Sequence, residues 1–492
     1  MNIYIQNHKY HYEIENLTRV FFPNSKLKII KEFCGEPEKP FILTSVDESD
    51  DISNIKVKIE LYDFSKELQL QLSNKITDFT NTCERAMAQL LFNLLQEYTG
   101  LTPPWGILTG VRPIKLFRSL CESQGLEETK KYLTEELFVT PEKTNLAAIT
   151  EANERAILSV SKPQSYSLYV SIPFCPSRCS YCSFVSQSIE KAQKLIEPYV
   201  ELLCKELAHT AKIAADLHLQ LETVYIGGGT PTTLSALQLK KLIESINLHY
   251  PMKNCKEFTV EAGRPDTITT EKLKAILDGG ADRISINPQT LNDGILEAIG
   301  RNHTAAETIT AFNLAREVGF KHINMDLIAG LPRESVQSFE NTLHKIIELN
   351  PESITLHTLA MKKASALTEQ GMSLYRKDAE NTSKMHSICN NRLEQNGYRP
   401  YYLYRQSRMV GNLENIGYAK KGKDGLYNVF VMDETHTILG CGAGAVTKLK
   451  NPYTGYLERI FNYKYPYEYI NGFMEILTRK DRCYSFYSQI GH

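Results

Sequence analysis

Three cysteines crowd into eight residues, and their spacing is typical of ligands to a metal centre. The segment reads Cys175-Pro176-Ser177-Arg178-Cys179-Ser180-Tyr181-Cys182. A structural zinc site needs four ligands, and no fourth Cys or His follows within the next few residues. Three thiolates can instead hold three irons of a [4Fe–4S] cluster, which leaves the fourth iron open to a small chelating ligand. The alternatives are a partial zinc site and cysteines that have no joint role.

Further blocks carry residue types that could bind such a ligand. The glycine run in Gly227-Gly228-Gly229-Thr230-Pro231 lets the backbone approach a ligand and offers N–H groups to a carboxylate or phosphate, although alone it would indicate only a tight turn. The Glu261 carboxylate could accept hydrogen bonds from ribose hydroxyls. Gln289, Arg301 and Asp326 then follow in that order. Any one of them could be an ordinary surface residue, whereas the series favours a common site.

These residues stand at or near the ends of predicted strands. Apolar runs alternate with helical segments, which predicts βα units and a parallel sheet. The predicted strands are Leu168–Ile172, Thr223–Ile226, Glu257–Val260, Arg283–Ile286, His322–Leu327 and Ser353–Leu359. The predicted helices centre on Tyr199–Ala214, Leu237–Leu248, Thr270–Leu277, Thr304–Val318 and Val336–Leu349, with Pro198 at the first position of its helix. We predict an α/β fold, a partial (β/α)6 barrel with its site at the carboxyl ends of the strands.

The regions on either side of the barrel differ from it. Two alternating strands, Ile55–Tyr62 and Glu67–Leu72, and a helix at Thr82–Tyr98, which Gly100 would stop, predict an N-terminal α+β domain. The tail is rich in Gly and Tyr and has no repeated βα unit. We therefore divide the chain into an N-terminal α+β domain with a helical linker, the barrel and a short C-terminal extension, at residues 1–162, 163–405 and 406–492.

Composition excludes several classes of protein. The 492 residues are 42% hydrophobic and 23% charged, which is ordinary globular composition and excludes disorder across the chain. Lys and Arg number 56 and Asp and Glu 57, so the net charge of −1 argues against a general nucleic-acid coat. The start, Met1-Asn2-Ile3-Tyr4, has no signal-peptide pattern, and the apolar runs are too short to span a membrane. We expect a cytoplasmic protein whose eleven cysteines are thiols or metal ligands.

The cysteine motif resembles that of the radical S-adenosylmethionine (SAM) superfamily. The likeness rests on the spacing together with Tyr169, Pro173 and Phe174 before it and Tyr181 and Phe184 around it. The order of the later blocks is similar to that in the oxygen-independent coproporphyrinogen III oxidase family, the HemN/HemW/HemZ group, and within it to the HemZ branch. The likeness to the HemZ branch rests on Ser171 before Ile172-Pro173-Phe174-Cys175, on the blocks Glu261–Asp266, Tyr401–Gln406 and Gly411–Asn415, and on the N-terminal extension. The family resemblance, which includes the block Asn324–Pro332, covers roughly Tyr166 to Lys448.

The resemblance implies two kinds of cofactor, a [4Fe–4S] cluster and SAM, with one or two SAM molecules bound. The cluster-ligand positions hold Cys175, Cys179 and Cys182. The positions at which HemN contacts its first SAM hold Tyr169, Gly228, Glu261 and Val446. The positions at which HemN contacts a second SAM hold Tyr181, Gly229, Thr230, Gln289, Arg301, Asp326 and Ala360.

The resemblance also implies a reaction, the oxidative decarboxylation of two propionates of coproporphyrinogen III to vinyl groups in heme biosynthesis. The implied electron donor is reduced flavodoxin or ferredoxin, and no nucleic-acid partner is implied. Arg264, Arg405 and Arg408 could bind the carboxylates of the anionic tetrapyrrole.

The chain departs from the family at three places. Ser171 stands where His is usual, and Phe184 stands where HemN often has a further Cys. The helical C-terminal domain that covers the substrate in HemN is shortened. Two alternatives to the oxidase therefore remain, a heme chaperone like HemW and a radical SAM enzyme that acts on heme itself.

Overall fold

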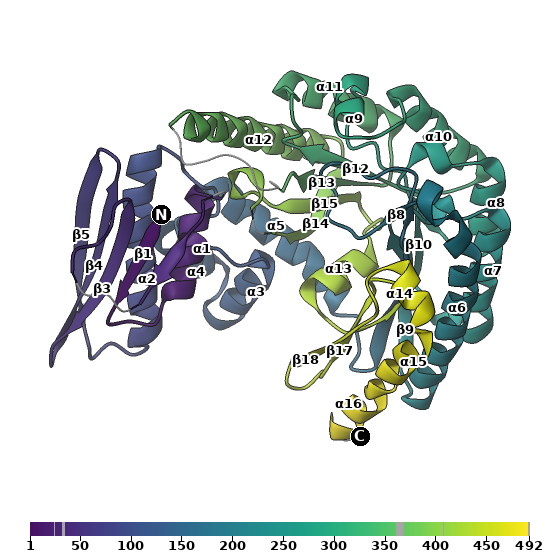
Figure 1. Ribbon diagram of the computed structural model, residues 1–492, viewed down its shortest axis with the longest axis horizontal. Coiled ribbons are helices and arrows are strands. Elements are labelled where there is room, and N and C mark those ends of the chain that lie inside the picture. The colour runs from purple at the N-terminus through teal and green to yellow at the C-terminus, as the bar shows by residue number, and fades with distance from the viewer. Residues whose placement is uncertain (24, 32–34, 361–368, 407, 491–492) are drawn as a thin grey trace. The chain divides into compact units, whose positions relative to one another are not determined.

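The computed structural model describes residues 1–492 except 24, 32–34, 361–368, 407 and 491–492 (Figure 1). The chain divides into two units. The first comprises Met1–Glu151, Thr358–His386 and Leu403–Asn415, and the second comprises Ala152–His357, Ser387–Tyr402 and Ile416–His492. Each unit is thus assembled from segments that are far apart in the sequence. The three-part division at residues 1–162, 163–405 and 406–492 stays a prediction.

The first unit is built on a five-stranded sheet with the strand order β2-β1-β3-β4-β5. Its strands are β1 (Asn2–Gln6), β2 (Lys28–Ile30), β3 (Phe41–Glu48), β4 (Ile52–Leu61) and β5 (Phe64–Ser73). The antiparallel pair β4 and β5 is the pair of alternating strands expected from the sequence.

Helices complete the first unit. They are α1 (His11–Phe21), α2 (Phe79–Thr99), α3 (Pro113–Gln124), α4 (Leu126–Lys131) and α5 (Pro141–Leu158), the last of which continues into the second unit. Met87, Leu91 and Leu95 of α2 are fully buried and share one apolar core with alternate residues of β4. The helix stops at Gly100, whose φ of 66° is the left-handed conformation that favours glycine.

The second unit contains most of an eleven-stranded sheet in the order β14-β15-β13-β12-β11-β10-β9-β6-β16-β17-β18. At its centre stand the six strands that the sequence predicts, β6 (Ser165–Ile172), β9 (Gln220–Gly228), β10 (Glu257–Glu261), β11 (Arg283–Ser285), β12 (His322–Ala329) and β13 (Ser353–Thr358). From β6 to β12 the neighbouring strands are parallel. Among the described strands, β14 and β18 form two open edges, so the fold is a partial barrel.

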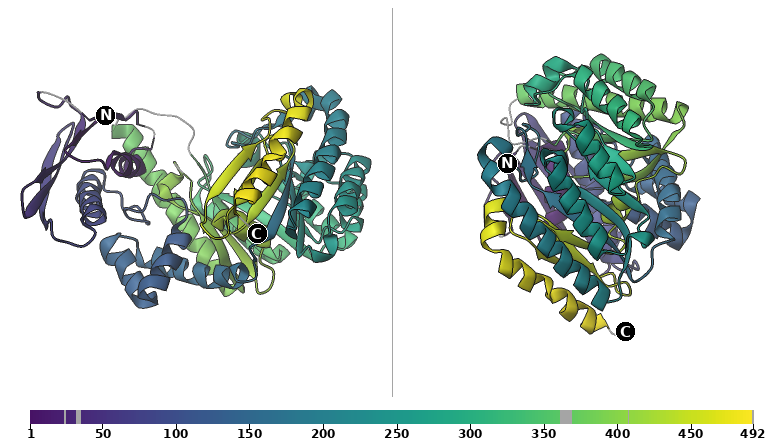
Figure 2. Two further views of the ribbon diagram at one scale, coloured as in Figure 1. Left: turned by 90° about the horizontal axis from the view of Figure 1, so that it is seen from below. Right: turned by 90° about the vertical axis from the view of Figure 1, so that its right-hand side faces the viewer.

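Helices lie in an arc outside this sheet (Figure 1, Figure 2). They are α6 (Ile189–Asp216), α7 (Ala236–His249), α8 (Thr270–Asp278), α9 (Asp293–Ala298), α10 (Ala305–Val318) and α11 (Val336–Leu349). Because helices cover the sheet, β12 is buried along most of its length. None of the helices in the described ranges is long and apolar enough to cross a membrane.

The position expected for Pro198 is wrong. Pro198 lies inside α6 rather than at its first position, since the helix begins at Ile189. Ala192 and Ile196, which precede the proline, are buried on the helix together with Tyr199. Their packing offsets the backbone hydrogen bond that a proline cannot donate.

The tail widens the sheet instead of adding βα units. Its strands are β14 (Tyr398–Tyr404), β15 (Asn415–Lys420), β16 (Thr437–Cys441), β17 (Val446–Lys450) and β18 (Leu457–Phe461). β16 pairs in parallel with β6, and β17 and β18 continue from it in antiparallel order. Helix α12 (Glu369–Gln395) precedes these strands and belongs to the first unit as far as His386. The later helices are α13 (Leu426–Asp433), α14 (Pro466–Asn471), α15 (Phe473–Lys480) and α16 (Arg482–Ile490).

A buried carboxylate on α6 fixes the tail to the barrel. Glu206 accepts hydrogen bonds of 2.7 Å from the Gly442 backbone N–H and from the Tyr469 hydroxyl. The Lys480 ammonium lies 3.4 Å from the same carboxylate, and both charged side chains are fully buried. The loop after β16 is therefore held against α6 by a charge-assisted network.

Candidate functional site

The cysteine loop leaves the carboxyl end of β6 and is tied at its base. A two-residue strand, β7 (Phe174–Cys175), pairs in parallel with β8 (Gln187–Ser188), so the intervening loop begins and ends at one place. Within it the Cys182 N–H donates to the Cys179 carbonyl at 3.2 Å. The three thiols are not joined in disulfides. They therefore lie on one loop at the end of the first barrel strand, as the sequence predicts.

The glycine loop after β9 packs directly on the first cysteine. The Gly229 N–H donates to the Ile172 carbonyl and the Thr230 N–H to the Phe174 carbonyl, each at 2.8 Å. The Thr230 hydroxyl lies 3.6 Å from the Cys175 sulfur. A Cβ at Gly229 would stand 3.0 Å from that sulfur and 2.6 Å from a backbone oxygen. Glycine is required at this position because of this close approach.

Two buried arginines border the second cysteine. The Arg264 guanidinium donates to the Cys179 sulfur at 3.8 Å. Arg301 interacts with Tyr181 and Cys179 and donates to the Gly263 carbonyl at 3.3 Å and to the Asn287 carbonyl. Arg264 is 3% exposed and Arg301 is 7% exposed. Cys179 thus has two buried positive charges beside it, whereas Arg178 and Ser180 of the same loop are exposed.

A carboxylate and stacked tyrosines lie at the ends of β6, β9 and β10. The Tyr225 hydroxyl donates to Glu261 at 2.5 Å, and its ring stacks on Tyr427 at 4.4 Å between centroids and on Tyr169 at 6.3 Å. Burial raises the pKa of Glu261 to about 7; the hydrogen bond from Tyr225 opposes this shift, and the nearby Asp326 carboxylate adds to it. Tyr225 and Tyr427 were not among the predicted site residues. Tyr225 lies in the predicted strand Thr223–Ile226, but the sequence does not indicate its contact with Glu261.

Gln289 and Asp326 are neighbours across the sheet. The Gln289 N–H donates to the Asp326 carbonyl at 2.9 Å, and Gln289 has a φ of 68°, which is unusual for a residue with a side chain. In the part of the chain that the structure describes, Gln289 Oε1 and Arg301 Nε are buried without a hydrogen-bond partner. Buried polar atoms normally have partners, so these two suggest a ligand that supplies them.

The remaining predicted residues are placed differently. Val446 begins β17, and a Cβ on Gly440 would stand 2.7 Å from the Val446 carbonyl oxygen. Ala360 belongs to the other unit, where it pairs with Met409. Arg405 also belongs to that unit. Its side chain donates to the Leu108 carbonyl at 2.7 Å and is buried.

Arg408 is exposed in the same unit as Arg405. A carboxylate of the substrate would therefore have to compete with internal partners for Arg405, whereas Arg408 faces solvent. The roles of the predicted SAM-contacting residues stay predictions.

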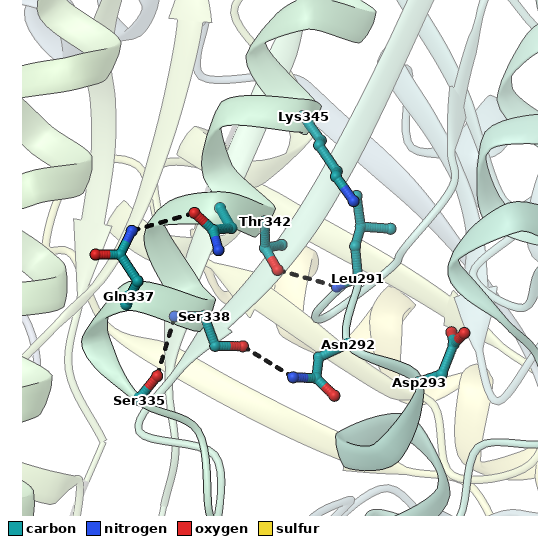
Figure 3. Close-up of a pocket in the computed structure, with 9 residues that line it drawn as sticks. Leu291, Asn292, Asp293, Ser335, Gln337, Ser338, Thr342 and Lys345 are labelled. Carbon is teal, nitrogen blue, oxygen red and sulfur yellow. Dashed lines mark hydrogen bonds between the residues drawn. The ribbon is translucent and has the colours of Figure 1, made fainter.

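A polar pocket opens elsewhere in the second unit, between α11 and the segment after β11 (Figure 3). The Leu291 N–H donates to the Thr342 hydroxyl and the Asn292 side chain to Ser338, each at 3.1 Å. The pocket is lined by Leu291, Asn292, Asp293, Ser335, Gln337, Ser338, Asn341, Thr342 and Lys345. None of the residues predicted to bind the cluster or SAM lines it.

The buried carboxyl of Glu334, just before α11, should make the stability of the protein depend on pH. Burial raises its pKa to about 7, although Thr290 donates a 2.6 Å hydrogen bond to it. Below its usual pKa, a carboxyl whose pKa is raised on folding is neutral in both states and does not change the free energy of unfolding. As the pH rises to about 7, the raised pKa lowers that free energy progressively. In urea unfolding followed by circular dichroism, Glu334→Gln should be more stable than the wild type at pH 8, by up to about 3 kcal/mol. The two proteins should be equal near pH 4.

A matched control is Glu348→Gln, because Glu348 is exposed on α11. It should leave the pH profile unchanged. An unaltered profile for Glu334→Gln would refute the assignment of the pH dependence to this residue.

Comparison with known proteins decides the family. A family model of the radical SAM superfamily matches residues 169–346. The oxygen-independent coproporphyrinogen-III oxidase-like protein HemZ of Bacillus subtilis is 35% identical over 97% of this chain and 96% of its own length. This chain belongs to the HemN/HemW/HemZ family of radical SAM proteins.

The heme chaperone HemW of Bacillus subtilis, another member of this family, is 32% identical over 61% of this chain and 77% of its own length. Among solved structures, coproporphyrinogen III oxidase (HemN) from Escherichia coli is similar with a TM-score of 0.47 and 22% identity, over 66% of this chain and 72% of that one. The chain therefore matches HemZ over nearly its whole length and HemW over a smaller share.

Members of the radical SAM superfamily bind a [4Fe–4S] cluster and SAM, and this chain has the donor set for the cluster. Three soft thiol ligands share one loop, and a buried guanidinium beside Cys179 can balance part of the negative charge of a cluster with thiolate ligands. Among the described residues, no three Cys, His, Asp or Glu side chains are arranged to hold a metal ion.

Proposed function

We propose that this protein is an oxygen-independent coproporphyrinogen III dehydrogenase, which converts two propionates to vinyl groups and yields protoporphyrinogen IX. The observation that carries the proposal is the 35% identity to the coproporphyrinogen-III oxidase-like protein HemZ, which extends over 97% of the chain. The similarity includes the N-terminal unit as well as the radical SAM residues. Because the similarity extends over nearly the whole chain, it favours an activity shared with HemZ over an activity that requires only the radical SAM barrel.

The chain's own residues would position the reactants. Cys175, Cys179 and Cys182 would hold the cluster, and the bound cofactors would supply a 5′-deoxyadenosyl radical that can remove a hydrogen atom from a propionate β-carbon. Loss of CO2 and transfer of one electron to an external one-electron acceptor would then leave a vinyl group in place of each propionate. The Glu261 carboxylate would accept hydrogen bonds from ribose hydroxyls, and the buried, unpartnered Gln289 Oε1 would accept from a SAM donor.

The electron for the reaction would come from a reduced flavodoxin or ferredoxin. Gln289 and Arg301 are buried and Glu261 is partly buried, which would limit the access of water to radical chemistry beside them. Exclusion of water from such a site limits side reactions.

A second candidate function is that of a heme chaperone. It is favoured by the 32% identity to HemW over 77% of that protein. A chaperone would bind heme stably and release it unchanged, whereas an oxidase would alter its tetrapyrrole.

The test is an anaerobic incubation of the iron–sulfur-reconstituted protein with SAM, a reductant and coproporphyrinogen III. Mass spectrometry would follow the tetrapyrroles and 5′-deoxyadenosine, with a reaction lacking SAM as control. Vinyl products that appear together with 5′-deoxyadenosine are expected. Deoxyadenosine without any change in the porphyrinogen would refute this substrate. Stable heme binding without product in a parallel incubation would then support the chaperone.

A further inference from the structure

Arg264, one of the three arginines that the sequence offered for a substrate carboxylate, is buried and is paired with residues of this chain. It follows β10 and begins the turn Pro265–Thr267. Its guanidinium contacts three residues, Asp266, Ser177 and Cys179. Nε and Nη2 each lie 3.1 Å from one oxygen of Asp266, which makes a two-point ion pair. Nη1 lies 3.1 Å from the Ser177 hydroxyl and 3.8 Å from the Cys179 sulfur.

These contacts fix the guanidinium in one orientation. A two-point arginine–carboxylate pair sets both the position and the plane of the group. The Arg264 backbone is held as well, because the Thr267 hydroxyl donates to its carbonyl at 2.7 Å. The Ser177 hydroxyl in turn donates to the Gly300 carbonyl at 3.0 Å. The N–H that faces Cys179 is therefore an arranged donor rather than one conformation of a mobile side chain.

We propose that Arg264 is a positioning residue that donates an N–H···S hydrogen bond to the Cys179 thiolate and thereby raises the reduction potential of the cluster. A hydrogen bond to a ligand sulfur, and a nearby positive charge, stabilise the more negative reduced form. The cluster would gain one negative charge when a reduced electron-carrier protein gives it an electron. The Arg264 guanidinium would stabilise that charge. The inference rests on the proposed use of Cys179 as a ligand and is independent of the tetrapyrrole.

Asp266 should affect the reduction potential in the opposite direction, because it carries a negative charge. Its carboxylate holds Arg264 in place but brings a negative charge toward the same loop. Removing the guanidinium should lower the potential, whereas neutralising the carboxylate should raise it. A residue that serves only the packing of the loop would give no such opposite pair of shifts.

The experiment is a redox titration of the reconstituted full-length protein, monitored by electron paramagnetic resonance, with iron measured per chain. Arg264→Met should shift the midpoint potential to a more negative value. Arg264→Lys should give a smaller negative shift, because an ammonium keeps the charge but cannot bind Asp266 at two points and still reach the sulfur. Asp266→Asn should shift the potential to a more positive value.

Arg283→Met is the matched control. Arg283 is a buried arginine of the same sheet, and its guanidinium donates to Ser353 at 2.8 Å and to the Lys423 carbonyl at 2.9 Å. Its loss should weaken the fold and leave the potential of the cluster unchanged.

The proposal is overturned if Arg264→Met binds full iron and has the wild-type potential. If that variant does not hold a cluster, Arg264→Lys and Asp266→Asn decide, and wild-type potentials in both would refute the role. The potential is measured without a tetrapyrrole. A protein with the expected shifts that leaves coproporphyrinogen III unchanged would therefore contradict only the proposed substrate.

Discussion

Replacing Cys179 with alanine is expected to abolish formation of 5′-deoxyadenosine and to leave the reconstituted protein with little iron. Cys179 is the middle thiol of the loop, is 9% exposed and receives the Arg264 hydrogen bond. Two remaining thiolates cannot hold three irons of a [4Fe–4S] cluster, and no fourth Cys or His follows the motif within the next few residues of the sequence. The measurements are iron per chain and 5′-deoxyadenosine by mass spectrometry after an anaerobic incubation with SAM and a reductant.

Cys204→Ala is the control for loss of a cysteine as such. Cys204 is partly buried on α6 in the same unit, and burial raises the pKa of its thiol. It should retain iron and 5′-deoxyadenosine formation at wild-type levels. Full iron and undiminished deoxyadenosine in Cys179→Ala would contradict the ligand assignment.

The barrel could be predicted because its signal is local. Parallel strands covered by helices carry runs of apolar residues, such as Val224–Ile226 in β9 and Leu327–Ala329 in β12. The helices between them show their own periodicity, and the cysteine spacing is readable without any fold. The six central strands and five of the helices were found for this reason, with ends that differ from the structure by a few residues or, for α6, by more.

The remaining features depend on contacts that are distant in sequence. Nothing in residues 437–441 indicates that they pair with β6, because any short apolar strand could join either edge of the sheet. The sequence indicated Arg264 only as a possible partner of a substrate carboxylate, and its burial beside Cys179 is evident only in the structure. For Arg405 the sequence led to the wrong partner. This arginine was expected to bind a substrate carboxylate, but it is buried and donates to the Leu108 carbonyl of its own unit.

Glu414 shows the same limit in the first unit. Its sequence context, Gly411-Asn412-Leu413-Glu414-Asn415, indicated a family block but no role. In the structure its carboxylate is fully buried and accepts hydrogen bonds from Trp105 at 2.7 Å and from Lys143 at 2.6 Å, with His386 3.4 Å away. Burial alone would raise the pKa of Glu414, but the Lys143 ammonium and His386 hold it well below its usual range.

Glu414→Gln is therefore expected to lower the free energy of unfolding of the first unit by about 3–5 kcal/mol, because it leaves the buried Lys143 ammonium without a counter-charge. Trp105 is the chain's single tryptophan and touches Glu414, so its fluorescence during urea unfolding reports on this unit. The double variant Glu414→Gln/Lys143→Met should recover part of the loss, since it removes the unpaired charge.

Glu97→Gln supplies the comparison within the same unit. Glu97 pairs with Lys66 at 2.7 Å, but the two side chains are 50% and 43% exposed. Water screens such a pair, so its loss should cost less than about 1 kcal/mol. If Glu414→Gln cost no more than Glu97→Gln, the buried network would not stabilise the unit. A large loss that the double variant partly reverses would instead identify the Lys143–Glu414 charge pair as a main source of its stability.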